Sequence, residues 1–147
     1  MAKKPKILFL STGSPTRSQI AEGFMCAMAS DRFSAESAST ESGAVNPLAT
    51  EVMQEAGIDI SERRPKELKQ TFKEYFAYVI TMYDPAEKSP TFPFTLKVVR
   101  WKLPDPSKAD ASGEEKKEMF RRARDEIREC VAKFLDDTVR NDRQRAA

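Results

Sequence analysis

The feature that most constrains this chain is an apolar run over residues 6–10 that passes directly into the segment STGSPTRS, residues 11–18. Such a short apolar run is typical of a central strand in a parallel sheet. Apolar residues at helical spacing begin at Arg17 and continue to about Ser30. A strand, a tight polar loop and a helix are therefore expected to follow one another here.

The rest of the chain continues to alternate strand and helix signals. Asn46 before a proline predicts a helix start, Gly57 predicts the end of that helix, and Thr71 with Glu74 has the spacing of a capping box. Strands are expected over 6–10, 33–39 (as an edge strand), 78–82 and 97–101, and helices over 17–30, 47–57 and 113–138. This alternation predicts an α/β three-layer sandwich with a four-stranded parallel sheet flanked by helices. We expect a single domain over residues 1–140 and a polar tail over 141–147.

The residue composition excludes several kinds of chemistry. The chain has no histidine, which excludes Ser-His-Asp and Cys-His catalysis and the usual histidine-bearing zinc sites. We therefore expect no metal and no cofactor. Its two cysteines, Cys26 and Cys130, form no CxxC motif and are expected to reach no catalytic loop. A net charge of +2 does not point to nucleic acid, and no apolar run is long enough to span a bilayer or form a signal peptide, so a cytoplasmic setting is expected.

The loop after the first strand has the composition of an oxyanion site. Backbone N–H groups at a helix N-terminus point at the loop, and the helix dipole adds partial positive charge there. Arg17 can hold two oxygens of a tetrahedral anion as a bidentate fork, while Gly13 allows the backbone to approach closely. The residues expected to bind the oxyanion are Ser11, Thr12, Gly13, Ser14, Thr16, Arg17 and Ser18.

These residues resemble the loop of the low-molecular-weight protein tyrosine phosphatase superfamily, and within it the thiol-dependent arsenate reductases. The family loop reads CTGNSCRSQMAEG, where this chain has STGSPTRSQIAEG. The stretches 45–61, 78–90 and 101–135 also resemble the reductase branch. The resemblance implies a phosphatase I-like, flavodoxin-like fold, a nucleophile at the position of Ser11, and a general acid at Asp105, which precedes Pro106. Phosphate, arsenate or a phosphorylated molecule is the ligand it implies.

This chain departs from the family pattern where the chemistry would take place. Ser11 stands at the position of the nucleophilic cysteine, and Thr16 at that of a second loop cysteine. The two further cysteines of the thioredoxin-linked reductases align with Met82 and Ser89. A serine hydroxyl is a far weaker acid than a thiol and needs an adjacent base, and an oxygen cannot supply the electrons that reduce arsenate. Ser14 and Pro15 are also expected to reshape the loop.

Three interpretations follow from these residues. The first is an oxyanion-binding protein of this superfamily that is catalytically inactive because its loop nucleophile is Ser11. The second is an active arsenate reductase or tyrosine phosphatase represented by a cysteine-to-serine substitution that traps ligand. The third is a protein-interaction module on the same fold, using aromatic residues such as Tyr75, Tyr78 or those at 92 and 94; the expected partners then include another protein, but neither nucleic acid nor a membrane.

Overall fold

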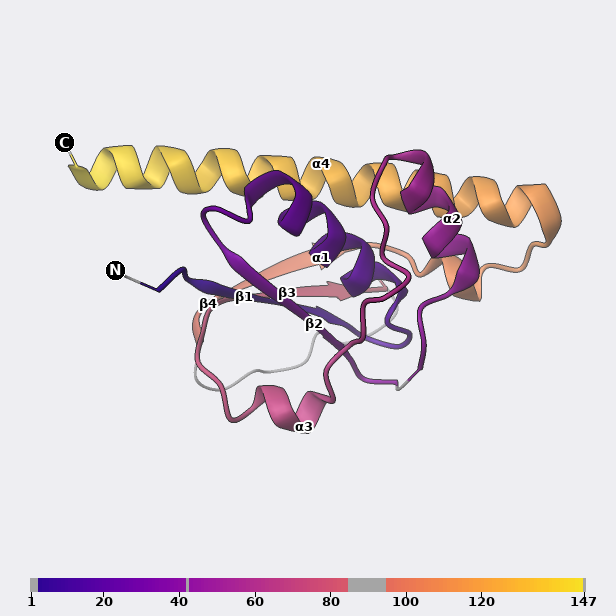
Figure 1. Cartoon of the computed structure of the whole chain (residues 1–147), viewed down its shortest axis with the longest axis horizontal. Coiled ribbons are helices and arrows are strands. Elements are labelled where there is room, and N and C mark those ends of the chain that lie inside the picture. The colour runs from indigo at the N-terminus through magenta and orange to yellow at the C-terminus, as the bar shows by residue number, and fades with distance from the viewer. Residues whose placement is uncertain (1–2, 42, 85–94, 147) are drawn as a thin grey trace.

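The computed structural model describes residues 3–41, 43–84 and 95–146 (Figure 1). In chain order the elements are β1 (Lys6–Ser11), α1 (Thr16–Ala29), β2 (Ser34–Ser39), α2 (Pro47–Glu55), α3 (Leu68–Thr71), β3 (Phe76–Tyr83), β4 (Thr95–Lys102), the 3-10 turn η1 (Pro106–Lys108) and α4 (Gly113–Ala146). All four expected strands are confirmed, with boundaries that shift by at most a few residues. Among the described residues, no helix combines the length and the apolar character that crossing a bilayer requires.

The four strands form one parallel sheet in the order β2-β1-β3-β4. The chain moves from β1 outward to β2 and then crosses over β1 to reach β3, so the strand order reverses between β1 and β3. In open parallel sheets, ligands bind beyond the carboxyl ends of the strands at such a reversal. Ser11 is the last residue of β1, paired with Ser39 on one side and Met82 on the other, and therefore lies at this point.

Alternating side chains of β1 divide the core between the two faces of the sheet. Ile7 and Phe9 belong to the larger hydrophobic cluster, which they share with residues of α1, α2 and α4. Leu8 and Leu10 belong to a smaller cluster, against which Leu68 of α3 packs. Figure 1 shows the same division, with α1, α2 and α4 on one side of the sheet and the short α3 on the other. The expected flanked parallel sheet is confirmed, although one face carries most of the helical mass.

The predicted ends of α2 are confirmed in detail. The Asn46 side chain accepts a hydrogen bond from the Leu48 amide at 2.9 Å and caps the helix, with Pro47 in the first helical position. At the other end, Gly57 has a φ of 81°, and the Ile58 amide donates to the Met53 carbonyl at 2.9 Å. A left-handed glycine with this bond is the usual way to satisfy the last carbonyls of a helix.

Two expectations about helix boundaries are wrong. Thr71 begins no helix; it is the last residue of α3, its hydroxyl donates to the Leu68 carbonyl, and Glu74 pairs with lysines instead of closing a capping box. The last helix does not stop at residue 138 but continues to Ala146, so residues 141–146 of the expected tail are helical. No glycine or proline follows Gly113, so nothing in the sequence ends the helix earlier.

Candidate functional site

The backbone of the loop is anchored to both strands that flank β1. The Thr12 amide donates to the Met82 carbonyl at 3.0 Å, and the Gly13 amide donates to the Thr40 hydroxyl at 2.6 Å. The Glu41 amide returns a bond to the Gly13 carbonyl at 3.0 Å. Gly13 has a φ of 91°, a left-handed conformation that favours glycine, so the sequence places a glycine where the chain must turn. The loop is therefore positioned by contacts on both sides.

Ser11 is fully buried beneath this loop, on the side of the sheet that faces α1. Its Oγ accepts a hydrogen bond from the Ser18 amide at 2.7 Å, and Ser18 is the third residue of α1. The residue directly before α1 is Pro15, which makes no side-chain cap of its own. The Ser11 hydroxyl consequently caps α1 from the end of the preceding strand. Within the described residues, no carboxylate or lysine is hydrogen-bonded to this hydroxyl to act as its base.

Arg17 lies behind the loop, with no exposed surface. Its Nη1 donates to the Leu103 carbonyl at 2.7 Å, and its Nη2 donates to the Thr12 carbonyl. Nη2 also lies 3.7 Å from Asp105 Oδ2. The guanidinium is thus held at the expected place, with one N–H of each terminal nitrogen directed at a main-chain carbonyl.

Asp105 faces the loop from the segment that follows β4. Its Oδ1 accepts hydrogen bonds from the Ser107 amide at 2.9 Å and the Ser107 hydroxyl at 2.7 Å, and so caps η1. Its Oδ2 accepts from the Ser14 hydroxyl at 2.7 Å. Residues 14 and 105 are 91 positions apart in sequence, so the fold itself delivers this carboxylate to the loop. In all three contacts the carboxylate acts as an acceptor.

The structure therefore brings all the expected site residues together, and their assigned roles stay predictions. Thr16 joins the others through its Oγ1, which lies 3.3 Å from the Ser14 hydroxyl oxygen. Sequence reasoning missed Thr40, Ser107 and Lys108, which all contact or approach the loop. Ser107 could have been found, because Asp-Pro-Ser has the pattern of a helix N-cap with proline in the first position.

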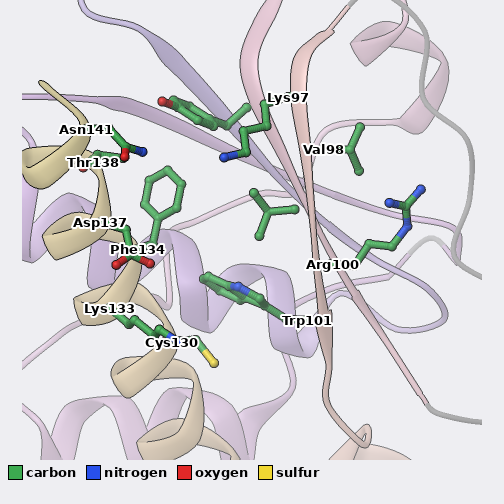
Figure 2. A pocket seen from close by; sticks show the side chains of 12 residues that line it. Lys97, Val98, Arg100, Trp101, Cys130, Lys133, Phe134, Asp137, Thr138 and Asn141 are labelled. Carbon is green, nitrogen blue, oxygen red and sulfur yellow. The ribbon is translucent and has the colours of Figure 1, made fainter. Parts of the chain in front are cut away.

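Neither cysteine belongs to the loop. Cys130 is half-buried and lines a cavity of about 470 Å³ between β4 and α4, beside Trp101 and Phe134 (Figure 2). Burial raises the pKa of the Cys130 thiol, which lowers its reactivity. The sulfur of Cys26 accepts a hydrogen bond from Arg63 Nη1 at 3.5 Å. In the part of the chain that the structure describes, no three His, Cys, Asp or Glu side chains gather as metal ligands would.

The aromatic residues considered as partner contacts differ in their surroundings. Tyr75 is 62% exposed. Tyr78 instead packs edge-on against Phe134, with ring centroids 5.0 Å apart, and contributes to the core. The phenylalanines at 92 and 94 lie outside the described residues. Of the described residues in this set, Tyr75 is mostly exposed, whereas Tyr78 is partly buried.

Over most of its length, the chain is similar to known proteins in sequence and in fold. Residues 6–145 match the family model described as low molecular weight phosphotyrosine protein phosphatase. An arsenate reductase of Bacillus licheniformis is 40% identical over 137 residues, which cover 92% of this chain and 98% of that protein. The arsenate reductase of Bacillus subtilis is 36% identical over 131 residues, or 88% of this chain and 94% of that protein. A solved structure described as an arsenate reductase in the phosphate binding state has a TM-score of 0.77 and 26% identity, and the match covers 90% of this chain and 98% of that one.

Proposed function

Because the chain belongs to the low molecular weight phosphotyrosine protein phosphatase family, we propose that it binds phosphate or arsenate in the loop over residues 11–18 and catalyses neither hydrolysis nor reduction there. The observation that carries this proposal is Ser11, whose oxygen stands at the nucleophile position and accepts the Ser18 amide. The likeness to a reductase in a phosphate binding state supports the choice of ligand. The curated reductases that are 36–40% identical support arsenate as the second ligand.

The chemistry of oxygen supports the absence of turnover. A hydroxyl attacks phosphorus only when a neighbouring base removes its proton, and no such base contacts Ser11 within the described residues. Reduction of arsenate to arsenite takes two electrons, which two thiols supply as their sulfurs join in a disulfide. An alcohol has no equivalent two-electron product, and neither Cys26 nor Cys130 lies in the loop. Ser11 thus accepts the hydrogen bond from the Ser18 amide but cannot supply the electrons that a cysteine at this position would supply.

The loop still offers donors to an anion. Within the described part of the chain, the amides of Ser14 and Thr16 donate to no protein acceptor, and they lie at the N-terminal end of α1, where partial positive charge accumulates. Arg17 adds a full positive charge beside the loop, and its Nη2 carries a second N–H besides the one that donates to the Thr12 carbonyl. A neutral hydroxyl at position 11 also repels a dianion less than a thiolate would. Binding is therefore favoured by the same substitution that removes catalysis.

Titration calorimetry with phosphate and arsenate tests the binding half of the proposal. The wild type should bind both anions, and Arg17→Ala and Arg17→Lys should weaken binding, because lysine keeps the charge but loses the fork. Arg100→Ala is the matched control, since Arg100 is an exposed arginine of β4 that should leave affinity unchanged. Circular dichroism verifies that the Arg17 variants remain folded. Equal weak heats for the wild type and both Arg17 variants would refute binding in this loop.

Assays with para-nitrophenyl phosphate and arsenate as substrates test the second half of the proposal, the absence of turnover. The wild type should show no turnover, whereas Ser11→Cys should gain phosphatase activity if the loop retains the geometry of its relatives. Wild-type turnover that disappears in Ser11→Ala would contradict the proposed inactivity.

A further inference from the structure

Two cationic groups converge on the space that the missing side chain of Gly13 leaves open. A Cβ atom built on Gly13 would lie 3.1 Å from Lys108 Nζ and 3.7 Å from Arg17 Nη2. Both groups therefore border the same point beside Gly13, although residues 17 and 108 lie far apart in the sequence. Only glycine leaves this space empty, because any other residue would place a carbon between the two cations.

Lys108 is delivered by the same segment that carries Asp105. It is the last residue of η1, and its amide donates to the Asp105 carbonyl at 3.2 Å. The Asp105 side chain caps this turn through the Ser107 amide, so the carboxylate and the ammonium are set by one short, capped structure. The position of Lys108 beside Gly13 is thus tied to the position of Asp105 beside the loop.

The ammonium group has a partner that it can exchange. Lys108 Nζ lies 3.1 Å from Glu41 Oε1, and the side chains of the pair are 51% and 56% exposed. An ion pair this exposed contributes little to stability, because water screens it and both side chains lose freedom. Glu41 is itself held at the loop by the hydrogen bond that its backbone N–H donates to the Gly13 carbonyl. A dianion in the loop would therefore compete with Glu41 for the same ammonium at close range.

We propose that Lys108 is a second cationic ligand of the oxyanion, held by Glu41 until an anion enters the loop. This inference rests on the proposed function, since it names a further contact of the same site. Lysine acts as a point charge with three donors, so it can follow an oxygen that faces solvent, while Arg17 holds oxygens at the base of the loop. The ligand class is a tetrahedral dianion with at least one solvent-facing oxygen: phosphate, arsenate or a phosphomonoester.

Calorimetric titration with inorganic phosphate at low ionic strength tests the inference on the full chain. Lys108→Gln should weaken phosphate binding by about fivefold, the effect of losing one partly exposed charge contact. Lys133→Gln removes the same charge from α4, beside the cavity of Figure 2, and should change affinity by less than about twofold. Glu41→Gln should strengthen phosphate binding by about two- to threefold, because it removes the carboxylate that competes with phosphate for Lys108.

The double variant Glu41→Gln/Lys108→Gln separates contact from general charge. If Glu41 acts by holding Lys108, its replacement should bring no gain once Lys108 is glutamine. An equal gain in both backgrounds would overturn the inference, since it would reflect only the removal of a negative charge. Phosphate binding that is lost in Arg17→Ala but unchanged in Lys108→Gln would overturn this inference and leave the proposed function intact. A wild type that binds no phosphate would refute both.

Discussion

Replacing Ser11 with alanine should destabilise the fold, because the hydroxyl caps α1. The Ser11 Oγ is fully buried and lies 2.7 Å from the Ser18 amide, the third of the helix. Loss of an N-cap acceptor costs about 0.5–2 kcal/mol. A buried N–H left without an acceptor costs about 1–3 kcal/mol. Both ranges describe the same lost bond, so they are not added, and we expect a loss of about 2 kcal/mol for Ser11→Ala.

Urea unfolding measures this loss directly. With an m value of about 2 kcal/mol per M, the unfolding midpoint of Ser11→Ala should fall by about 1 M while m stays unchanged. Ser61→Ala is the control, since Ser61 is an exposed serine whose hydroxyl donates to Asp59 at 2.6 Å, and its replacement should cost less than about 0.5 kcal/mol. Amide exchange of Ser18 should also accelerate in Ser11→Ala. A variant within about 0.5 kcal/mol of the wild type, with Ser18 still protected, would refute the capping role.

Three further predictions concern the loop, an exposed ion-pair cluster and a thiol. Gly13→Ala should lower the free energy of unfolding by about 1–2 kcal/mol, because a left-handed conformation penalises a side chain, and calorimetry should show weaker phosphate binding as Lys108 is displaced. The hydrogen bond from Arg121 lowers the pKa of Glu55 from 4.5 to about 2. The stability that the ionised Glu55 adds to the fold is therefore complete above pH 4.5 and is lost as the pH falls through 2. Urea unfolding of Glu55→Gln should therefore show a deficit at pH 7 that vanishes towards pH 2; a deficit independent of pH would contradict this. In Cys26→Ser, labelling of Cys130 with a thiol reagent should be slow at pH 8 and accelerate well above it, because burial raises the pKa of this thiol; fast labelling at pH 8 would show that the thiol is accessible and unperturbed.

The parts of the fold that depend on local sequence could be predicted. The apolar run before Ser11, the caps at Asn46 and Gly57, and the helix after the loop are each encoded by residues within a few positions of one another. The loop itself was found for the same reason. Ser11 and Arg17 both lie within this local segment, and the family resemblance pointed to Asp105 as well.

The contacts that close the site could not be predicted in this way. Arg17 donates to the Leu103 carbonyl, 86 residues away, and main-chain carbonyls carry no signal in the sequence. The expected capping box failed for a similar reason: Glu74 is drawn to Lys6 and Lys66, which the sheet brings beside it. Thr40 reaches the Gly13 amide only because β2 and β1 end at the same edge.

The inward hold on Arg17 has a kinetic consequence. If an anion binds as proposed, a ligand oxygen that takes the Nη2 N–H now directed at the Thr12 carbonyl would have to displace that carbonyl, so capture through this donor would include an opening step within the protein. At high ligand concentration the observed association rate should then level off at the rate of that opening instead of rising without limit. The breaking of the hydrogen bond between Arg17 and the Thr12 carbonyl, and not diffusion of the anion to the loop, would then limit the rate of binding.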